Sequence, residues 1–232
     1  MLFPKPLIEG VLQKRYKRFL GDLLLNNETV VGVHCTNTGS MKGILATPQR
    51  AWVLKSDNLK RKLPYTLEIL EIPQGNIGVN THRTNYLALE ALQNKLIPEL
   101  ADINIFQTEK KYGTNSRIDI LGITEDNQEV YIEVKNVSLA EGRKALFPDS
   151  VTERGTKHLE ELIKIIHAGK RAVMLFIAQR EDVENFSPES EIDPLYAATL
   201  KKAFDAGVEV YAYNCKVTPL EIVVSKRLQV IL

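Results

Sequence analysis

The sequence predicts a two-part protein of mixed α and β structure, with an all-β part over residues 1–80 and an α/β part over residues 81–232. Three observations lead to this fold class. Short β-type segments separated by turn residues fill the first part, which is typical of a small barrel or sandwich. In the second part β-type and helical segments alternate, which predicts parallel strands in one sheet. The first part carries a net charge of +5 and the second −4.

In the first part, alternating or continuous apolar residues predict strands at 30–34, 52–55, 65–72 and 77–79. Turn residues separate them, including a run of Asn, Thr, Gly and Ser at 37–40. Residues 10–25 are ambiguous, because Leu12, Tyr16 and Phe19 also suit a helical face. We predict β structure for this segment.

The second part predicts alternating helices and strands. Thr84 is a candidate cap for a helix that ends near Pro98. Strands at 116–123 and 129–137 flank the polar residues 124–128, which predicts a hairpin. Amphipathic helices follow at 151–167 and 194–206, each ended by a glycine, and further strands are predicted at 172–178, 208–213 and 220–225.

Composition excludes several classes of protein. Among 232 residues, 44% are hydrophobic and 25% charged, which is ordinary for a chain that buries a core rather than a disordered or collagen-like one. Two distant cysteines, Cys35 and Cys215, do not make a disulfide scaffold and fit a reducing compartment. The longest apolar run, 172–178, is too short for a membrane helix. Charges interrupt the first 20 residues, so we predict a cytoplasmic protein without a secretory signal.

The hairpin carries the residues that best predict chemistry. A turn centred on Asp126 sets Asp119 opposite Glu133, and opposed residues share a face of the sheet. Lys135 lies two residues beyond Glu133 and therefore projects on the same side. Mg²⁺ binds one or two carboxylates together with phosphate oxygens and water. Two carboxylates beside a lysine thus predict a metal-dependent centre for phosphodiester hydrolysis. The alternative is an ordinary solvated face, which is the commoner origin of such a triplet.

Several longer blocks of the chain are specific enough to show a family resemblance. The order helix, strand with Asp119, strand with Glu133 and Lys135, helix, strand resembles the PD-(D/E)XK nuclease-like superfamily, although Ile118 replaces the proline of that motif. Nearly end to end, the chain resembles the sugar fermentation stimulation protein (SfsA) family. The blocks that carry this resemblance are QKRYKRFL at 13–20, HCTNTGSM at 34–41, SDNLKRK at 56–62, SRID at 116–119, YIEVKNV at 131–137 and FPDSVTERGTKHL at 147–159.

The resemblance implies an N-terminal OB-like β-barrel (1–80) and a C-terminal restriction-endonuclease-like α/β domain (81–232). It also implies DNA binding, with a regulatory link to sugar metabolism, notably maltose. Carried over by position, Asp119, Glu133 and Lys135 are the catalytic triad, with Asp119 and Glu133 as ligands of Mg²⁺ or Mn²⁺. In some relatives of the superfamily a helix glutamate adds a ligand, and Glu90 fits that place as well as it fits an ordinary helix surface.

Two basic clusters of the first part are candidates for nucleic-acid contact, because phosphates attract cations and unstacked bases stack on aromatic rings. If the first cluster is a strand, its odd-numbered and even-numbered side chains occupy opposite faces. The alternative is a solubilising surface with the two aromatic rings in the core. The clusters are Lys14, Arg15, Tyr16, Lys17, Arg18 with Phe19, and Lys60, Arg61, Lys62.

A third candidate contact lies on the helix predicted at 151–167. Arg154, Lys157, His158 and Glu161 have the spacing of one helix face. Arg154 or Lys157 is placed to contact phosphate, while a plain solvated stripe explains the spacing equally well. His158 is interpreted as a hydrogen-bonded surface histidine rather than a metal ligand.

The sequence as a whole predicts a DNA-binding protein with a divalent-metal nuclease centre. The main alternative is a non-catalytic DNA-binding regulator on a nuclease scaffold. The sequence contains neither a phosphate-binding P-loop nor a dinucleotide fingerprint, so no nucleotide cofactor is expected. Membrane partners are not expected either. The oligomeric state is open, and a homodimer would suit an enzyme that cuts both strands.

Overall fold

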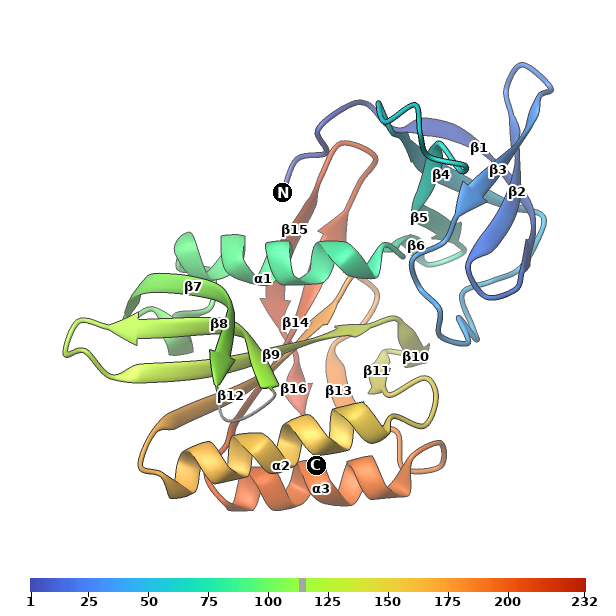
Figure 1. Cartoon of the computed structure of the whole chain (residues 1–232). Helices are drawn as coiled ribbons and strands as arrows, with labels where there is room; N and C mark the ends of the chain where they lie inside the picture. The colour runs from blue at the N-terminus through green and yellow to red at the C-terminus, as the bar shows by residue number, and fades with distance from the viewer. Residues whose placement is uncertain (113–115) are drawn as a thin grey trace.

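The computed structural model describes residues 1–112 and 116–232, in which a β-barrel sits at one end of an α/β unit (Figure 1). The first strands form one sheet in the order β3-β2-β1-β4-β5-β6, and an additional pairing of β3 with β5 closes a five-stranded barrel. Its interior holds the barrel's own apolar cluster, which includes Leu12, Leu23 and Leu67. The strands are β1 (Ile8–Tyr16), β2 (Leu20–Leu25), β3 (Val30–His34), β4 (Gln49–Lys55), β5 (Tyr65–Ile72) and β6 (Gly75–Gly78).

Residues 10–25 form an antiparallel hairpin rather than a helix, as predicted. The two strands are joined by a turn in which Lys17 and Arg18 adopt φ angles of 50° and 68°. Lys17, Arg18 and Phe19 therefore lie outside the strand, and the strand alternation predicted for their side chains does not extend to them. The alternative that places Tyr16 and Phe19 in the core is wrong, because both side chains are exposed.

The α/β unit is built on a six-stranded sheet in the order β15-β14-β12-β9-β8-β7. The three central strands are parallel, as the alternation of helices and strands predicted, and the outer pairings are antiparallel. This strand order places β9 between β12 and β8, and most of its side chains are buried. The strands are β7 (Ile103–Tyr112), β8 (Ser116–Thr124), β9 (Glu129–Val137), β12 (Arg171–Ala178), β14 (Glu209–Val217) and β15 (Ile222–Arg227).

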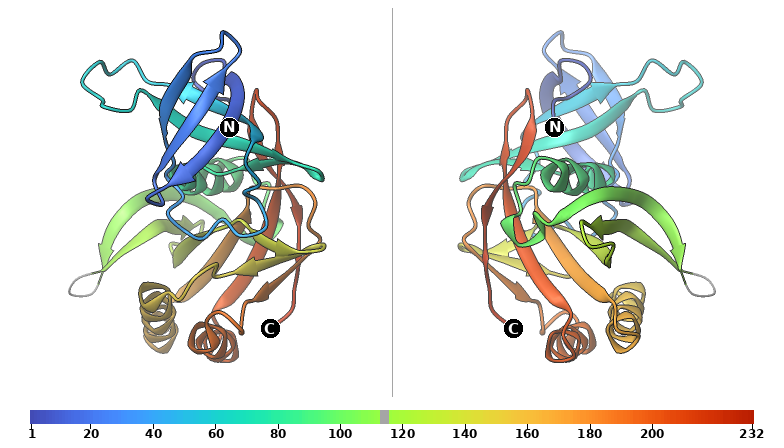
Figure 2. Two further views of the ribbon diagram at one scale, coloured as in Figure 1. Left: turned by 90° about the vertical axis from the view of Figure 1, so that its right-hand side faces the viewer. Right: turned by 90° about the vertical axis from the view of Figure 1, so that its left-hand side faces the viewer.

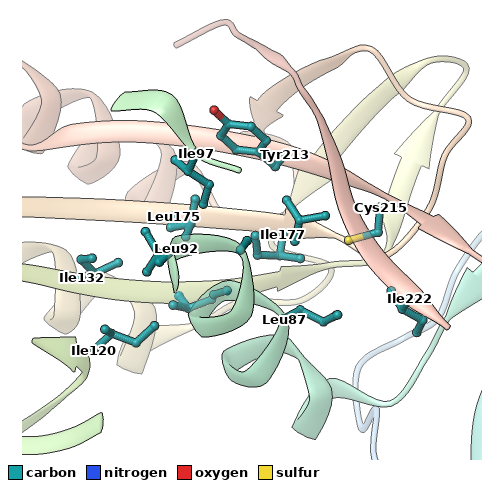
Figure 3. Close-up of a cluster of buried hydrophobic side chains, with 14 of the residues drawn as sticks. Leu87, Leu92, Ile97, Ile120, Ile132, Leu175, Ile177, Tyr213, Cys215 and Ile222 are labelled. Carbon is teal, nitrogen blue, oxygen red and sulfur yellow. The ribbon is translucent and has the colours of Figure 1, made fainter. Parts of the chain in front are cut away.

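Helices cover both faces of this sheet, so it has an apolar core on each side. Helix α1 (Thr84–Gln93) packs on one face, where Leu87 and Leu92 meet Ile132 and Leu175 (Figure 3). On the other face lie α2 (Glu153–His167) and α3 (Pro194–Asp205), which bury Leu159 and other apolar side chains. The apolar spacing of the sequence predicted α2 and α3 at these positions.

A small second sheet and several short elements were not predicted. The sheet has the order β10-β11-β13-β16, and its strands are too short to show a pattern in the sequence: β10 (Leu139–Glu141), β11 (Lys144–Phe147), β13 (Asn185–Pro188) and β16 (Gln229–Val230). Strand β7 was also missed. Thr84 is not the cap that was predicted, because the 3₁₀ turn η1 (Thr81–Arg83) precedes α1 and Asn80 caps that turn. Helix α1 ends at Gln93, before the 3₁₀ turn η2 (Pro98–Leu100).

The barrel lies against α1 and the β14–β15 hairpin (Figure 2), and one apolar cluster joins it to the α/β unit. Trp52 and Ile69 of the barrel belong to the same apolar cluster as Leu87 and Ile222. The loop between β3 and β4 lies close to the end of β9, and residues of both line one pocket. Among the described residues, no helix is long and apolar enough to cross a membrane.

Candidate active site

The β8–β9 hairpin has the register that the sequence predicted. Its ladder runs from Ile123 opposite Glu129 to Ile120 opposite Ile132. Beyond this ladder the contact between the strands is made by a side chain. Asp119 Oδ2 accepts a hydrogen bond of 2.8 Å from the backbone amide of Val134. This bond holds the Asp119 carboxylate against β9 beside Glu133.

Helix α1 provides a second donor to Asp119. Nδ2 of Asn85, in the first turn of the helix, donates to Asp119 Oδ1 over 2.9 Å. Burial raises the pKa of the Asp119 carboxyl, and the nearby charge of Glu133 raises it further. The two carboxylates are therefore close enough to repel each other, which is the electrostatic condition that a bound cation relieves.

Glu133 is almost fully buried, and two side chains contact one of its oxygens. Lys135 Nζ donates to Glu133 Oε1 over 2.6 Å, and His158 Nδ1 contacts the same oxygen. Burial alone raises the pKa of Glu133, but His158 and Lys135 together outweigh burial and hold it below its ordinary value. Glu133 is thus a carboxylate that stays ionised in a largely dry environment.

His158 belongs to this cluster, contrary to its interpretation as a surface histidine. Its Nε2 accepts a hydrogen bond from Arg154 Nε at 3.3 Å. The ring proton is then on Nδ1, which donates a hydrogen bond to Glu133. Lys135 Nζ lies 3.3 Å from the same ring nitrogen. The sequence placed His158 on a polar helix face, but only the packing of α2 on β9 shows that this face meets Glu133.

The structure does not bring Glu90 to the two carboxylates. Its side chain is 40% exposed and pairs with the Met1 ammonium group at 2.5 Å. Glu90 lies five residues after Asn85, and an α-helix turns once in 3.6 residues, so the two side chains point in different directions. Within residues 1–112 and 116–232, no three His, Cys, Asp or Glu residues gather as a metal cage. Asn85 is the residue of α1 that reaches Asp119.

The first basic cluster divides into structural and exposed members. The guanidinium of Arg15 donates to the carbonyls of Arg18, Asn37 and Gly39 at 2.6–2.9 Å, and so ties the β1–β2 turn to the β3–β4 loop. Lys14 pairs with Asp22 at 3.1 Å, and the Tyr16 hydroxyl donates to the same carboxylate at 2.9 Å.

Lys14, Tyr16, Lys17 and Arg18 are all exposed, and of these Lys17 and Arg18 lie at the tip of the turn. The other basic residues differ in the same way. Lys60 and Lys62 are exposed, while Arg61 is half-buried and donates to Thr66 Oγ1 at 3.1 Å. On α2, Arg154 and Lys157 are both exposed, close to His158. The cations therefore lie on separate loops of the barrel and on the helix that covers the carboxylates.

The donor set of Asp119 and Glu133 suits a hard divalent cation, because both ligands are oxygen anions and Mg²⁺ completes its shell with water and phosphate oxygens. Lys135, on the same side of β9, provides a positive charge next to that position. Together these groups can bind a metal ion and stabilise charge that develops on a phosphate.

The fold defines a class of protein in which an OB-like barrel precedes an α/β domain. Residues 14–79 match the family model described as the SfsA N-terminal OB domain. Residues 82–221 match the model described as the sugar fermentation stimulation protein RE domain. The chain therefore belongs to the SfsA family, as the sequence blocks indicated.

Relatives of similar length match almost the whole chain. A sugar fermentation stimulation protein homolog of Geobacter sulfurreducens is 45% identical over 231 residues, covering 100% of this chain and 99% of the relative. A homolog of Maricaulis maris is 47% identical over 231 residues, covering 99% and 98%. The solved structure of Pyrococcus furiosus SfsA in complex with Ca²⁺ has a TM-score of 0.89 at 30% identity, covering 100% of this chain and 98% of that one.

Proposed function

We propose that this protein is a DNA-binding nuclease that hydrolyses phosphodiester bonds with a divalent metal ion. The observation that carries the proposal is a cluster at which β8, β9 and α2 meet. Asp119 of β8 is hydrogen-bonded to β9, and Glu133 of β9 is bonded to Lys135 and to His158 of α2. A solvated hairpin face, the alternative for this triplet, does not bury a glutamate to 2% exposure.

Each side chain has a distinct role in this proposal. Asp119 and Glu133 hold the metal ion, which when bound activates water and offsets charge on the phosphate. Lys135 positions the attacking water or stabilises the negative charge of the transition state. Asn85 and His158 orient the two carboxylates, since each donates to one of them. The Ca²⁺ complex of the Pyrococcus relative supports a divalent ion, and Mg²⁺ or Mn²⁺ is our proposal for this chain.

We propose a division of labour between residues 1–80 and residues 81–232. The barrel binds the nucleic-acid backbone through exposed cations, chiefly Lys17, Arg18, Lys60 and Lys62, and the α/β unit carries the chemistry. Arg154 and Lys157 on α2 add two exposed cations beside His158, which contacts Glu133. Arg15 contributes through structure, because it holds the turn that presents Lys17 and Arg18.

A cleavage assay tests this function directly. Single-stranded, duplex and branched DNA and RNA are incubated with the protein and Mg²⁺, Mn²⁺ or a chelator. We expect metal-dependent cutting that Asp119→Asn and Lys135→Ala each lower by roughly 100-fold or more. Glu129→Gln is the matched control, because Glu129 is a half-exposed carboxylate on the same strand that pairs with Lys170 at 2.6 Å. The nuclease proposal fails if no substrate is cut with either metal.

A second candidate function is a non-catalytic DNA-binding regulator. The observation that favours it is that Glu133 already has a cationic partner in Lys135 and a ring donor in His158. The family description names sugar fermentation stimulation, and a regulatory role in sugar use belongs to this candidate. Salt-sensitive DNA binding that survives Asp119→Asn, without any cutting, would favour it over the nuclease.

A further inference from the structure

The loop between β4 and β5, residues 56–64, carries an exposed leucine. Leu59 is 99% exposed, and the next most exposed large apolar residues among those described, Val151 and Leu220, are 70% and 69% exposed. The other leucine of the loop, Leu63, packs back on the barrel, because a Cβ atom added at Gly32 of β3 would lie 3.0 Å from its Cδ2. The exposure is therefore a property of one position and not of the whole loop.

Hydrogen bonds hold the loop backbone on both sides of this leucine. The Ser56 amide donates to the Pro64 carbonyl over 2.7 Å, which closes the base of the loop. Near the tip, Asn58 Oδ1 accepts from the Lys60 amide over 3.0 Å. Leu59 is thus presented by a defined backbone conformation, and a side chain presented in this way loses less conformational entropy when it binds a partner.

The unpaired charges of the loop are positive. Lys60 and Lys62 are exposed. Asp57, the acidic residue of the loop, pairs with Lys5. The partner that fits this surface carries negative charge outside and apolar groups inside. Duplex DNA has this arrangement, because its phosphates lie outside and its stacked bases inside. An anionic membrane shares this property, so the position of the loop in the molecule distinguishes the two partners.

The loop lies on the same side of the molecule as the candidate active site. In both views of Figure 2, loop 56–64, the β7–β8 hairpin and α2 project on one side. On the hairpin, Arg117 is exposed and precedes Asp119 by two residues. On α2, His158 contacts Glu133. A duplex that lies along this side reaches both the loop and the carboxylates, whereas a membrane gives the carboxylates no role.

We propose that Leu59 inserts between the base pairs of duplex DNA and unstacks one step. Leucine is one of the apolar side chains that DNA-bending proteins insert as wedges, at a cost in stacking free energy. A mismatched step costs less to unstack, so the preferred substrate is a duplex that opens or bends easily. Lys60 and Lys62 hold the phosphates beside that step. This inference rests on the DNA binding of the proposed function and is independent of cleavage.

Fluorescence of 2-aminopurine tests the insertion without cleavage, because this base analogue fluoresces weakly when stacked and more strongly when unstacked. It is placed beside a mismatch in a short duplex, and the protein is added with a chelator so that no metal-dependent cutting occurs. We expect the protein to raise the fluorescence and to bind the mismatched duplex roughly 10-fold more tightly than the matched one. Leu59→Ala should abolish the rise and bring the two affinities to within about twofold of each other.

Leu59→Met and Leu195→Ala are the matched controls. Methionine keeps a long apolar side chain at the tip, so the fluorescence rise should remain. Leu195 is a 64% exposed leucine on α3, and its truncation should change neither the fluorescence nor the preference for a mismatch. Because Leu59 is almost fully exposed, Leu59→Ala removes no core packing and should leave the circular dichroism spectrum unchanged.

An equal fluorescence rise with Leu59→Ala and with the parent protein would overturn the insertion. Binding to vesicles of anionic phosphatidylglycerol that Leu59→Ala abolishes, without any effect on the fluorescence, would overturn it too and assign the tip to a membrane. If the fluorescence rises through Leu59 but nothing is cut with Mg²⁺ or Mn²⁺, the nuclease function fails and the insertion stands. If DNA is cut and no base is unstacked, the insertion alone fails.

Discussion

Asn85 of α1 is hydrogen-bonded to Asp119 of β8. Nδ2 of Asn85 donates to Asp119 Oδ1 over 2.9 Å, while the Val134 amide donates to the other oxygen over 2.8 Å. Both oxygens of the carboxylate are therefore fixed in direction. Helix α1 therefore contacts Asp119 through the neutral side-chain amide of Asn85. Glu90, the acidic residue of this helix, pairs with the Met1 ammonium group instead.

Asn85→Ala should loosen the Asp119 carboxylate without removing it. Loss of a side chain that orients a metal ligand typically costs 10- to 100-fold in metal affinity or activity, and we expect a loss of about this size. Mn²⁺ binding followed by calorimetry measures it independently of cleavage. Glu90→Gln is the control on the same helix and should leave Mn²⁺ affinity unchanged. A larger loss for Glu90→Gln than for Asn85→Ala would restore Glu90 as a ligand.

His158→Ala should lower the cleavage rate by roughly 10- to 100-fold, because Glu133 loses the ring that orients it. We expect the change in kcat rather than in KM for DNA, since His158 contacts Glu133 and is largely buried. Lys157→Ala, a variant of the exposed neighbour, should raise KM instead. Single-turnover and steady-state rates separate these two effects. Equal effects of both variants on KM would mean that His158 acts only as part of the basic surface.

Lys60 and Lys62 test the role of the barrel in binding. Both are exposed on a loop whose tip, Leu59, is 99% exposed. The double variant Lys60→Ala/Lys62→Ala should weaken DNA binding and reduce the slope of log affinity against log salt by about 2, roughly 1 for each lost phosphate contact. Fluorescence anisotropy over a salt series measures the slope. Lys201→Ala on α3, which pairs with Asp205, is the control, and an unchanged slope in the double variant would contradict barrel binding.

The sequence predicted the parts of the fold whose apolar pattern is long and regular. The register of the β8–β9 hairpin followed from its turn, and so did the approach of Asp119 to β9. Strands β10, β11, β13 and β16 were missed because two to four residues cannot show an alternation. Strand β7 was missed because its sequence, INIFQTEKKY, loses its apolar residues toward the end.

The candidate site was predictable only where its residues lie on one hairpin. His158 and Asn85 come from helices, and their approach to Glu133 and Asp119 depends on how α2 and α1 pack on the sheet. Periodicity predicts which face of a helix is buried but does not predict the strand residue that a polar side chain at the edge of that face will meet. For the same reason, no pattern in the sequence distinguished Arg15, which binds three carbonyls, from its exposed neighbours.

A buried ion pair between Glu68 of the barrel and Arg83, which precedes α1, is expected to contribute to the free energy of unfolding. Glu68 on β5 is 1% exposed and accepts from Arg83 at 2.9 and 3.1 Å, and from Asn80 at 3.0 Å. Arg83→Met would remove the cation and leave the buried Glu68 carboxylate with Asn80 as a neutral donor. Breaking such a pair costs about 3–5 kcal/mol, so we expect the free energy of unfolding to fall by that amount.

Urea denaturation followed by circular dichroism measures the change, with the midpoint lowered and the slope unchanged. Arg50→Met is the matched control, because Arg50 makes two ion pairs, with Glu9 and Glu71, at the exposed surface of the same barrel. Ion pairs in water contribute little to stability, so this variant should unfold close to the parent midpoint. Equal losses from both variants would mean that burial of Glu68 adds nothing, and that the barrel is held to α1 by the apolar contacts of Trp52 and Ile69 alone.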